Sequence, residues 1–275
     1  MAAGLRDPFS QLEYTGWQRV AGKYDSAWGG LTRLFIRPLL DAVGLEPSLP
    51  LLDVACGPGY VAEAALALGA APLGLDFSPA MVQLARARVR GVVFVCGDAQ
   101  ALPFEPGTFD AVLMNFGLLH LAHPEAALAE ARRVLRVGGR YAFTVWAGPE
   151  QSAGASVVDQ AIRAHASFDV ELPQGPAYYG YGDAESCRRV LDGVGFDLGS
   201  LRFYTVTATW QVPTASFVFA AERDAGVRTA ALLAAQPPAV CAAIEAQLAT
   251  GLMSFRNAAG FAIPYAAHVI SVTAA

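Results

Sequence analysis

Charged residues and paired cysteines are scarce in this chain of 275 residues. Asp, Glu, Lys and Arg together make up 16%, whereas average globular proteins carry about 25%. Hydrophobic residues make up 54%, which excludes an intrinsically disordered protein. The cysteines are far apart and form no C-x-x-C pair: they are Cys56, Cys96, Cys187 and Cys241. The sequence therefore predicts neither a disulfide framework nor a metal site.

An excess of basic charge is also missing. With 19 basic and 24 acidic residues the net charge is −5, which disfavours nucleic-acid binding by bulk electrostatics. The first residues lack the basic-then-apolar order of a signal peptide. The longest uncharged run, 257–275, contains Gly260, Pro264 and His268 and fits a membrane helix poorly. We therefore expect a cytoplasmic protein with neither nucleic acid nor a membrane as partner; its oligomeric state stays open.

Short apolar strands alternate with helical segments over the first half of the chain. Each apolar run ends near glycine or an acid, and each helical segment is rich in alanine and leucine. The expected strands are 49–55, 71–76, 92–96, 109–114 and 140–146, and the expected helices are 61–68, 79–90 and 124–135. This alternation predicts an α/β fold with a mainly parallel sheet and helices on both faces.

The remainder of the chain interrupts this repeat. A helix over 183–193 and a strand over 201–210 continue it, but residues 148–182 and 211–260 are too long to be plain connections. We expect an N-terminal helical lid (1–46), a cofactor-binding core (47–146), a helical cap insertion (147–183), a continuation of the core (184–210), a second cap insertion (211–260) and a last core strand (261–275).

A glycine turn follows the first expected strand. Gly57-Pro-Gly59-Tyr-Val-Ala62 fits G-x-G-x-x-A between a strand and a helix, and Asp76 ends the next strand. This arrangement is typical of an adenosine ribose site, because glycines admit the ligand close to the backbone and the carboxylate accepts from the ribose hydroxyls. The turn alone leaves a dinucleotide, or no ligand at all, as alternatives.

Two further acids favour a different adenosyl ligand. Asp53 lies within the first strand, four residues before Gly57. A pyrophosphate prefers backbone N–H groups without a nearby anion, so a carboxylate here suits a ligand with a cationic amino-acid end. Asp98, after the third expected strand, is placed to accept from the exocyclic amine of adenine.

Successive segments resemble the ordered motifs of class I S-adenosylmethionine-dependent methyltransferases, and most closely the ubiquinone/menaquinone-methyltransferase-like group. These segments are Leu52–Gly59, Leu75–Met81, Gly97–Phe104, Phe109–Val112 and Arg133–Arg140. The resemblance covers residues 47–146 and is weak in the first 46 residues and in both insertions. It implies a Rossmann-like, seven-stranded sheet whose antiparallel last strand comes from residues 262–273. It also implies S-adenosylmethionine as cofactor and S-adenosylhomocysteine as its product.

The resemblance implies that a set of residues surrounds the cofactor. These are Asp53, Ala55, Gly57 and Gly59 at the methionine end, Asp76 at the ribose, Phe77, Met81, Asp98 and Ala99 at the adenine, Asn115 and Phe116 beside the sulfonium, and Tyr24 as part of a lid.

His120 is the best candidate for a general base. It follows the fourth strand, where a loop should face the transferred methyl group, and histidine changes protonation near neutral pH. A histidine that only lines the site, or that bonds backbone groups at a helix start, are the alternatives. Aromatic residues are the candidates for contacting the substrate beside His120: Trp17, Trp146, Tyr178, Tyr179 and Tyr181. For each of them, ordinary packing is the competing interpretation.

The combined interpretation is a methyltransferase acting on a small apolar or aromatic molecule by in-line methyl transfer to O, N or C. A non-methylating cyclase, lyase or binding module on the same scaffold is the first alternative. A nicotinamide oxidoreductase is the second, although Asp53 disfavours it. Arg132, Arg133 and Arg136 are interpreted as a solvated helix face.

Overall fold

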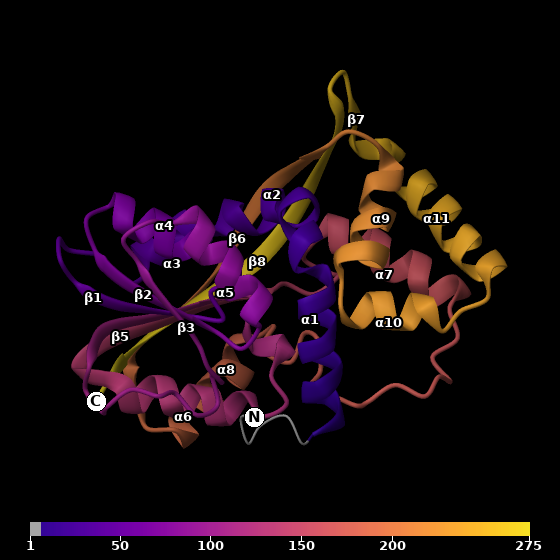
Figure 1. Cartoon of the computed structure of the whole chain (residues 1–275). Coiled ribbons are helices and arrows are strands. Elements are labelled where there is room, and N and C mark those ends of the chain that lie inside the picture. The colour runs from indigo at the N-terminus through magenta and orange to yellow at the C-terminus, as the bar shows by residue number, and fades with distance from the viewer. Residues whose placement is uncertain (1–6) are drawn as a thin grey trace.

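The computed structural model describes residues 7–275, so the first six residues of the expected lid (1–46) lie outside the described chain. Figure 1 shows two lobes joined by long strands. One lobe holds the sheet and the helices on its two faces. The other holds helices from both insertions. Helix α1 (Pro8–Ala27) stands between them.

The sheet has the order β3-β2-β1-β4-β5-β8-β6, with the short β7 paired to β8. Its strands are β1 (Pro50–Val54), β2 (Ala71–Asp76), β3 (Val93–Cys96), β4 (Phe109–Asn115), β5 (Leu135–Trp146), β6 (Phe196–Val212), β7 (Arg256–Asn257) and β8 (Gly260–Ala274). Strands β1 to β5 pair in parallel, whereas β8 inserts antiparallel between β5 and β6. The predicted fold class and the antiparallel last strand are confirmed.

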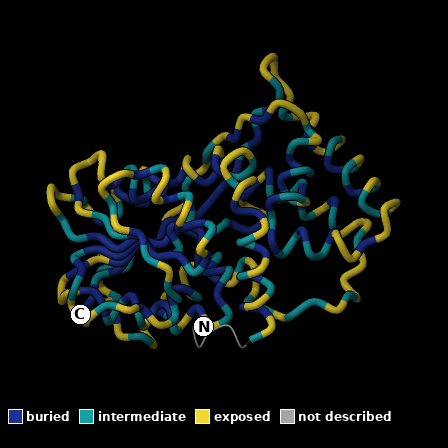
Figure 2. The backbone as a smooth tube through the Cα atoms, in the orientation of Figure 1, coloured by how far each residue is buried: buried dark blue, intermediate teal, exposed yellow. Residues whose placement is uncertain are grey.

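Alternating side chains of the central strands bury both faces of the sheet. Leu52 of β1 and Val112 of β4 pack towards one face, and Leu51 and Leu113 pack towards the other. A strand covered on both faces must be apolar throughout, which explains the short continuous apolar runs in the sequence. Figure 2 shows these central strands as the most continuous buried part of the chain.

Helices cover each face. One face carries α3 (Ile36–Asp41), α4 (Tyr60–Ala67) and α5 (Pro79–Arg88), and the other carries α6 (Pro124–Val134) and α8 (Ala184–Gly193). Ser78 caps α5 by accepting from the Met81 N–H, with Pro79 in the first turn. Between α1 and α3 lie the short α2 (Gly29–Thr32) and the 3₁₀ turn η2 (Arg33–Phe35).

The second lobe has its own apolar core. Its helices are α7 (Ala153–His165), α9 (Ala215–Ala225), α10 (Arg228–Ala234) and α11 (Pro238–Leu252), followed by the 3₁₀ turn η4 (Met253–Phe255). These helices pack around Trp210 and Val212 of β6 and Ile263 of β8. At these residues β6 and β8 extend beyond the end of β5. Both insertions therefore form one cap on two long strands.

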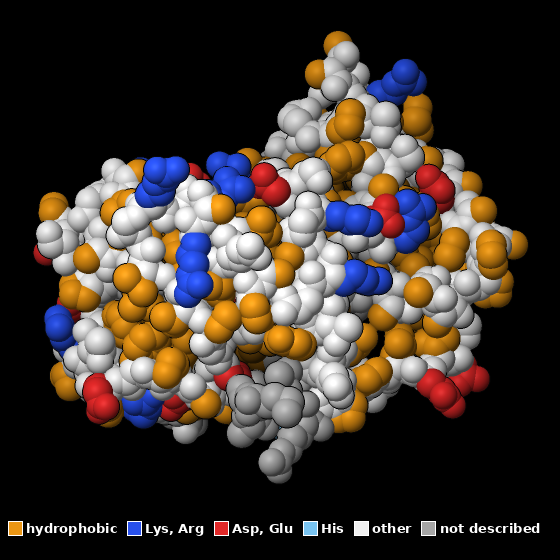
Figure 3. Space-filling view, in the orientation of Figure 1, with side chains coloured by type: hydrophobic (Ala, Val, Ile, Leu, Met, Phe, Trp, Pro, Cys, Tyr) orange, Lys and Arg blue, Asp and Glu red, His pale blue; other side chains and the backbone are white. Residues whose placement is uncertain are grey.

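The outer surface mixes side-chain types. On the face in Figure 3, hydrophobic side chains are scattered over both lobes, with Lys and Arg among them. By length and composition one segment, Pro238–Phe255, is apolar enough to cross a membrane, and only 17% of it is buried. It forms the outer helix of the cap, so its apolar character also suits packing on α7 and α9.

Candidate active site

A cavity of about 1040 Å³ lies between the carboxyl ends of the parallel strands, helix α1 and the cap. Ligands of open α/β sheets bind at this edge, beside the point where strand order reverses. The cavity is lined from Asp98 at one end to Tyr178 and Leu232 of the cap at the other. Pockets for one drug-sized ligand typically measure roughly 300–1,000 Å³, so this cavity lies at the upper end of that range.

The turn after β1 has the backbone needed for close approach of a ligand. Ala55, Gly57 and Gly59 have φ of 54°, 52° and 85°, values that L-residues rarely adopt. Gly57 lines the cavity, and a side chain built on it would meet open space. Gly59 instead begins α4, where a Cβ would lie 3.1 Å from Ala85. Gly57 thus faces the cavity, whereas Gly59 permits packing of α4 on α5.

Asp53 lies beneath this turn and does not line the cavity. Its side chain is fully buried; Oδ2 accepts from the Ala62 N–H at 3.1 Å, and Oδ1 has no hydrogen-bond partner among residues 7–275. Burial raises the pKa of Asp53 to about 8, opposed by the Ala62 bond and reinforced by Asp76. A buried carboxyl group with an unpaired oxygen is suited to balance a cation placed just above it.

Asp76 ends β2 and faces the cavity. Its Oδ2 accepts from the Gly57 N–H at 2.8 Å and its Oδ1 from the Ser78 N–H at 2.9 Å. Burial raises its pKa to about 6, although both hydrogen bonds oppose the rise. Each oxygen keeps acceptor capacity, so the carboxylate can also accept from two neighbouring hydroxyls such as a ribose diol.

The residues expected around adenine lie together in space. Phe77, Met81, Asp98 and Ala99 all line the same end of the cavity. Asp98 accepts through Oδ1 from the Gln100 N–H at 2.9 Å, which fixes the start of the loop after β3. This end of the cavity therefore combines apolar walls with one carboxylate, which suits a purine ring and its amine.

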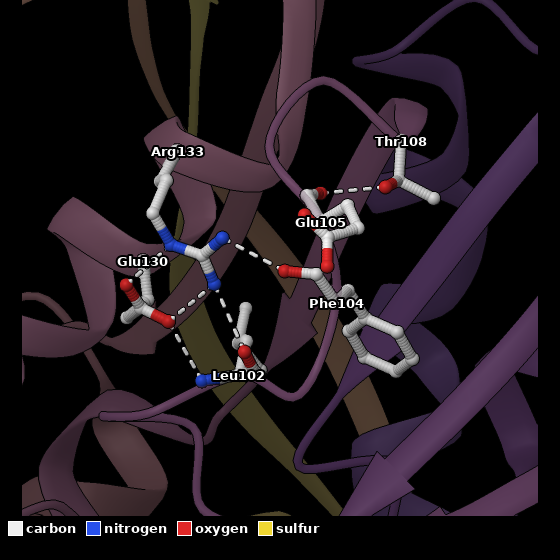
Figure 4. Close-up of polar contacts among 6 residues, drawn as sticks. All are labelled: Leu102, Phe104, Glu105, Thr108, Glu130 and Arg133. Atoms are coloured by element: carbon white, nitrogen blue, oxygen red, sulfur yellow. Dashed lines mark hydrogen bonds and ion pairs between the residues drawn. The ribbon is translucent and has the colours of Figure 1, made fainter.

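Arg133 holds this loop in place (Figure 4). Its guanidinium donates to the carbonyls of Leu102 at 2.9 Å and Phe104 at 2.7 Å and pairs with Glu130 at 2.7 Å. Glu130 in turn accepts from the Leu102 N–H. Arg133 was interpreted as part of a solvated face; its side chain is 34% exposed, but its planar fork also fastens residues 102–104 to α6.

The end of β4 presents a second group of predicted residues. The Asn115 side chain accepts from the Thr144 hydroxyl at 2.6 Å and donates to the Thr32 carbonyl at 3.3 Å. Phe116 has a φ of 57° and stacks on Trp146 with ring centroids 3.8 Å apart. The cavity is lined by Asn115, Phe116 and Trp146. Strained backbone such as that of Phe116 is often found at sites that position a ligand.

Helix α1 closes one side of the cavity. Trp17 and Tyr24 line it, with their rings 5.6 Å apart, and burial raises the pKa of Tyr24 to about 12. Gln18 fastens α1 to α5 because its Oε1 accepts from the Ser78 hydroxyl and the Ala80 N–H, both at 2.9 Å. Sequence reasoning missed Gln18, since a glutamine in a helix of mixed polarity carries no signal of its partner.

His120 ends the 3₁₀ turn η3 (Leu118–His120) and lines the cavity. Its Nδ1 lies 2.9 Å from Oε2 of Glu13, and its ring meets that of Trp17 edge-on with centroids 4.8 Å apart. Glu13 was missed from the sequence; its only local signal is the four-residue spacing from Trp17, which places both on one helix face.

The cap contributes the far end of the cavity. Tyr178 and Tyr179 line it, and Arg228 supports this loop by donating to the Pro176 carbonyl at 3.0 Å. Tyr181 does not: it is buried in the sheet core and donates to Glu125. Glu222, missed from the sequence, faces this end, and burial raises its pKa to about 7.

The described residues fit an adenosyl amino acid. The carboxyl group of Asp53 has an unpaired oxygen beneath the glycine turn, Asp76 keeps acceptor capacity, and Gly57 leaves open space in front of its Cα. These features would hold the amino-acid end, the ribose and the chain between them. The end of the cavity that the cap lines then remains for a second, largely apolar ligand.

Comparisons with known proteins identify related sequences. A family profile described as a methyltransferase domain matches residues 52–143. A demethylmenaquinone methyltransferase of Renibacterium salmoninarum is 36% identical over 177 residues, which cover 62% of this chain and 73% of the relative. A ubiquinone/menaquinone biosynthesis C-methyltransferase UbiE of Acidiphilium cryptum is 38% identical over 133 residues, covering 44% of this chain and 53% of that protein.

Solved structures share the fold at low sequence identity. The [4+2]-cyclase SpnF superposes with a TM-score of 0.58 at 19% identity, covering 98% of both chains. A phosphoethanolamine N-methyltransferase 2 of Haemonchus contortus, solved with S-adenosylhomocysteine, has a TM-score of 0.58 at 16% identity, covering 99% of this chain and 60% of that one. At such identities these similarities establish the architecture alone.

Proposed function

The chain belongs to the class I S-adenosylmethionine-dependent methyltransferases of the ubiquinone/menaquinone type, and from this premise we propose that it methylates a hydroxylated aromatic ring of the quinol class. Its cofactor is S-adenosylmethionine, whose sulfonium supplies an electrophilic methyl group. The acceptor is a small molecule. We propose a ring carbon as the methylated atom because one relative is named a C-methyltransferase.

The observation that carries this proposal is the continuity of the cavity from Asp76 to an apolar chamber in the cap. Val158 and Ile162 of α7, Leu172 of the following loop and Leu232 of α10 line that chamber. Its aromatic floor is the stacked pair Phe116 and Trp146. A planar ring with an apolar substituent suits these walls, because apolar surface is removed from water and aromatic rings stack favourably.

The residues around the chamber supply what methyl transfer needs. Helix α1 and the cap line the chamber, so a ring bound there would be shielded from water and would face the β4 end. His120 is the side chain placed to take the proton of a ring hydroxyl. Loss of this proton puts negative charge on the oxygen and on the neighbouring ring carbon, which then forms the bond to the methyl group. The hydrogen on that carbon then leaves as a proton and the oxygen regains one, so the net release is one proton per methyl transferred.

The test is methylation of a short-chain demethylmenaquinol, kept reduced, by the purified protein with S-adenosylmethionine. We expect S-adenosylhomocysteine and a product with one added methyl group, placed on carbon by fragmentation in mass spectrometry. An ester- or ether-type product would move the acceptor to oxygen. Cofactor binding without S-adenosylhomocysteine formation over a panel of quinols, phenols and amines would favour a non-methylating role on this fold.

We propose that the protein is soluble and works in the cytoplasm on this acceptor without a nucleic-acid partner. The net charge of −5 supports the last point, as does the mixed surface of the described residues in Figure 3. Fractionation of cells expressing the tagged chain tests the location. Recovery with the membrane fraction at high salt would contradict it.

A further inference from the structure

Glu13 is a buried carboxylate of helix α1 in contact with the catalytic candidate His120. Its side chain is completely buried. Oε2 lies 2.9 Å from Nδ1 of His120 and accepts from Nε1 of Trp17 at 3.0 Å, while Oε1 has no hydrogen-bond partner among residues 7–275. The two residues are 107 positions apart in the sequence and lie on different elements.

Burying a carboxylate is unfavourable unless a cation or several donors face it. Across the described chain Glu13 has the Trp17 indole N–H and the His120 ring as its partners, and its one salt-bridge partner is His120. The carboxylate is therefore best satisfied when the imidazole carries a proton on Nδ1, and better still when the ring is positively charged. Glu13 is the one charged residue on the buried face of α1, whose other buried members are Phe9, Ser10, Gly16, Val20 and Ala21.

The other ring nitrogen remains for chemistry. Nε2 of His120 forms no hydrogen bond with residues 7–275. This atom is not buried, and His120 lines the cavity. With Nδ1 protonated, Nε2 is the nitrogen with a free electron pair. This is the arrangement of a general base whose orientation is set by a carboxylate.

We propose that Glu13 is the positioning residue of a Glu13–His120 dyad, which fixes the Nδ1–H form of the ring and stabilises its charge when Nε2 takes the hydroxyl proton of the acceptor. In that step the O–H bond breaks, its electron pair stays on oxygen, and a new N–H bond forms on Nε2. The proton then passes to solvent as His120 returns to its neutral form. The proton transfer in this inference rests on the proposed function, namely a hydroxylated acceptor. The Nδ1–H form of the His120 ring does not depend on the acceptor.

The dyad also couples the base to the lid. Helix α1 is fastened by Gln18 to Ser78 and Ala80, next to the ribose carboxylate Asp76. The same docked position of α1 that closes the cofactor end brings Glu13 to His120. The base is thus complete only when α1 lies against α5 and η3.

The first test is independent of activity. Nitrogen-15 NMR of the histidine side chains, with the His120 signals assigned by His120→Ala, should show a proton on Nδ1 of His120 in the unmodified protein. Glu13→Gln should change the His120 signals, whereas Glu46→Gln, which removes an exposed carboxylate outside the cavity, should not. A His120 ring protonated on Nε2 in the unmodified protein overturns the proposal, even if Glu13→Gln fails to fold.

The second test uses turnover. With a weakly acidic quinol or phenol, we expect Glu13→Gln and His120→Ala each to lower kcat by about 10²-fold, with the Kd for S-adenosylmethionine within about threefold of the unmodified protein. In the His120→Ala background, Glu13→Gln should cause no further loss, because residues that act as a unit are not additive. An acceptor that is already ionised at the assay pH should restore both variants.

Additive losses, or equal losses with ionised and un-ionised acceptors, would assign Glu13 a structural role and overturn the dyad. Failure of the unmodified protein to methylate any hydroxylated acceptor would instead overturn the proposed function. The NMR result would then decide the dyad by itself.

Discussion

The backbone N–H of Gly57 donates to Oδ2 of Asp76 at 2.8 Å, joining the glycine turn after β1 to the end of β2. One carboxylate thus fixes the turn and presents acceptor capacity to the cavity. The turn and the acid form one structural unit, although Gly57 and Asp76 are 19 residues apart. Changing either should affect both the local fold and cofactor binding.

Asp76→Ala should weaken S-adenosylmethionine binding by about 1–2 kcal/mol or more, since hydrogen bonds to a charged group are lost. Calorimetric titration measures this change. The variant also leaves the Gly57 and Ser78 N–H groups unpaired, so its melting temperature without cofactor must be measured alongside. Asp76→Asn, which keeps one acceptor, should fall between the two. Equal affinity in all three proteins would remove the ribose assignment.

Binding of S-adenosylmethionine should release protons. Burial raises the pKa of Asp53 to about 8, so the free protein holds a proton there at pH 7. A cationic amino group placed above the turn favours the ionised carboxylate, so the complex binds fewer protons than the free protein. Linkage then requires affinity to rise with pH between about 6 and 8, with release of up to about one proton. Titrations in buffers of different ionisation enthalpy measure the release.

The matched variant for this effect is Asp53→Asn, which keeps the size of the side chain and cannot ionise. Its affinity should be lower at pH 8 and should depend less on pH. The pKa of Asp76 is raised to about 6, so ionisation of Asp76 also makes affinity rise with pH, but at lower pH. The Asp53→Asn variant retains this part of the pH dependence. An unchanged proton release in Asp53→Asn would show that another group is responsible.

Gln18→Ala should loosen the lid. The change removes the acceptor for the Ser78 hydroxyl and the Ala80 N–H, both at 2.9 Å, so α1 keeps only the Arg88–Asp25 pair among its described polar contacts with α5. We expect faster limited proteolysis within Pro8–Ala27 and an affinity for S-adenosylmethionine lowered by about tenfold, in the range for lost hydrogen bonds. Gln11→Ala, which alters an exposed position on the same helix, serves as control. Similar proteolysis of both variants would argue against this attachment.

Arg133→Lys should destabilise the protein despite keeping the charge. A lysine cannot reproduce the fork that reaches the carbonyls of Leu102 and Phe104 and the carboxylate of Glu130 together. We expect a loss of about 1–3 kcal/mol in the free energy of unfolding, from buried carbonyls left unpaired. Urea unfolding measures it. Arg37→Lys, at an exposed pair with Asp41, should change stability by less than about 0.5 kcal/mol.

The local elements followed from short-range patterns in the sequence. The strand over 71–76 is found at those residues, and the helix beginning at Pro79 has the expected cap and ends two residues before the predicted 90. Strand ends were less predictable where tertiary pairing extends them. Strand β5 begins at Leu135, the last residue of the predicted helix, and runs through two glycines, because Phe109 of β4 supplies a partner for Leu135.

Residues near the glycine turn were identifiable because their spacing is fixed by the strand–turn–helix unit itself. Tyr181 was not separable from Tyr178 and Tyr179 by sequence, since an aromatic loop gives no sign of which ring turns into the core. The structure sends Tyr181 against Phe143 of the sheet and leaves the other two at the cavity. Which of these tyrosine rings faces the cavity depends on tertiary packing, which the local sequence does not reveal.

The sequence by itself determined the α/β core and the residues around the glycine turn, because hydrophobic period, glycine turns and strand-end acids act over a few residues. Only the tertiary structure decided the position of β8 between β5 and β6 and the joining of two insertions into one cap. It also decided the meeting of Glu13 with His120. These relationships depend on chain segments far apart in sequence, and they form only when burial of apolar surface brings the segments together.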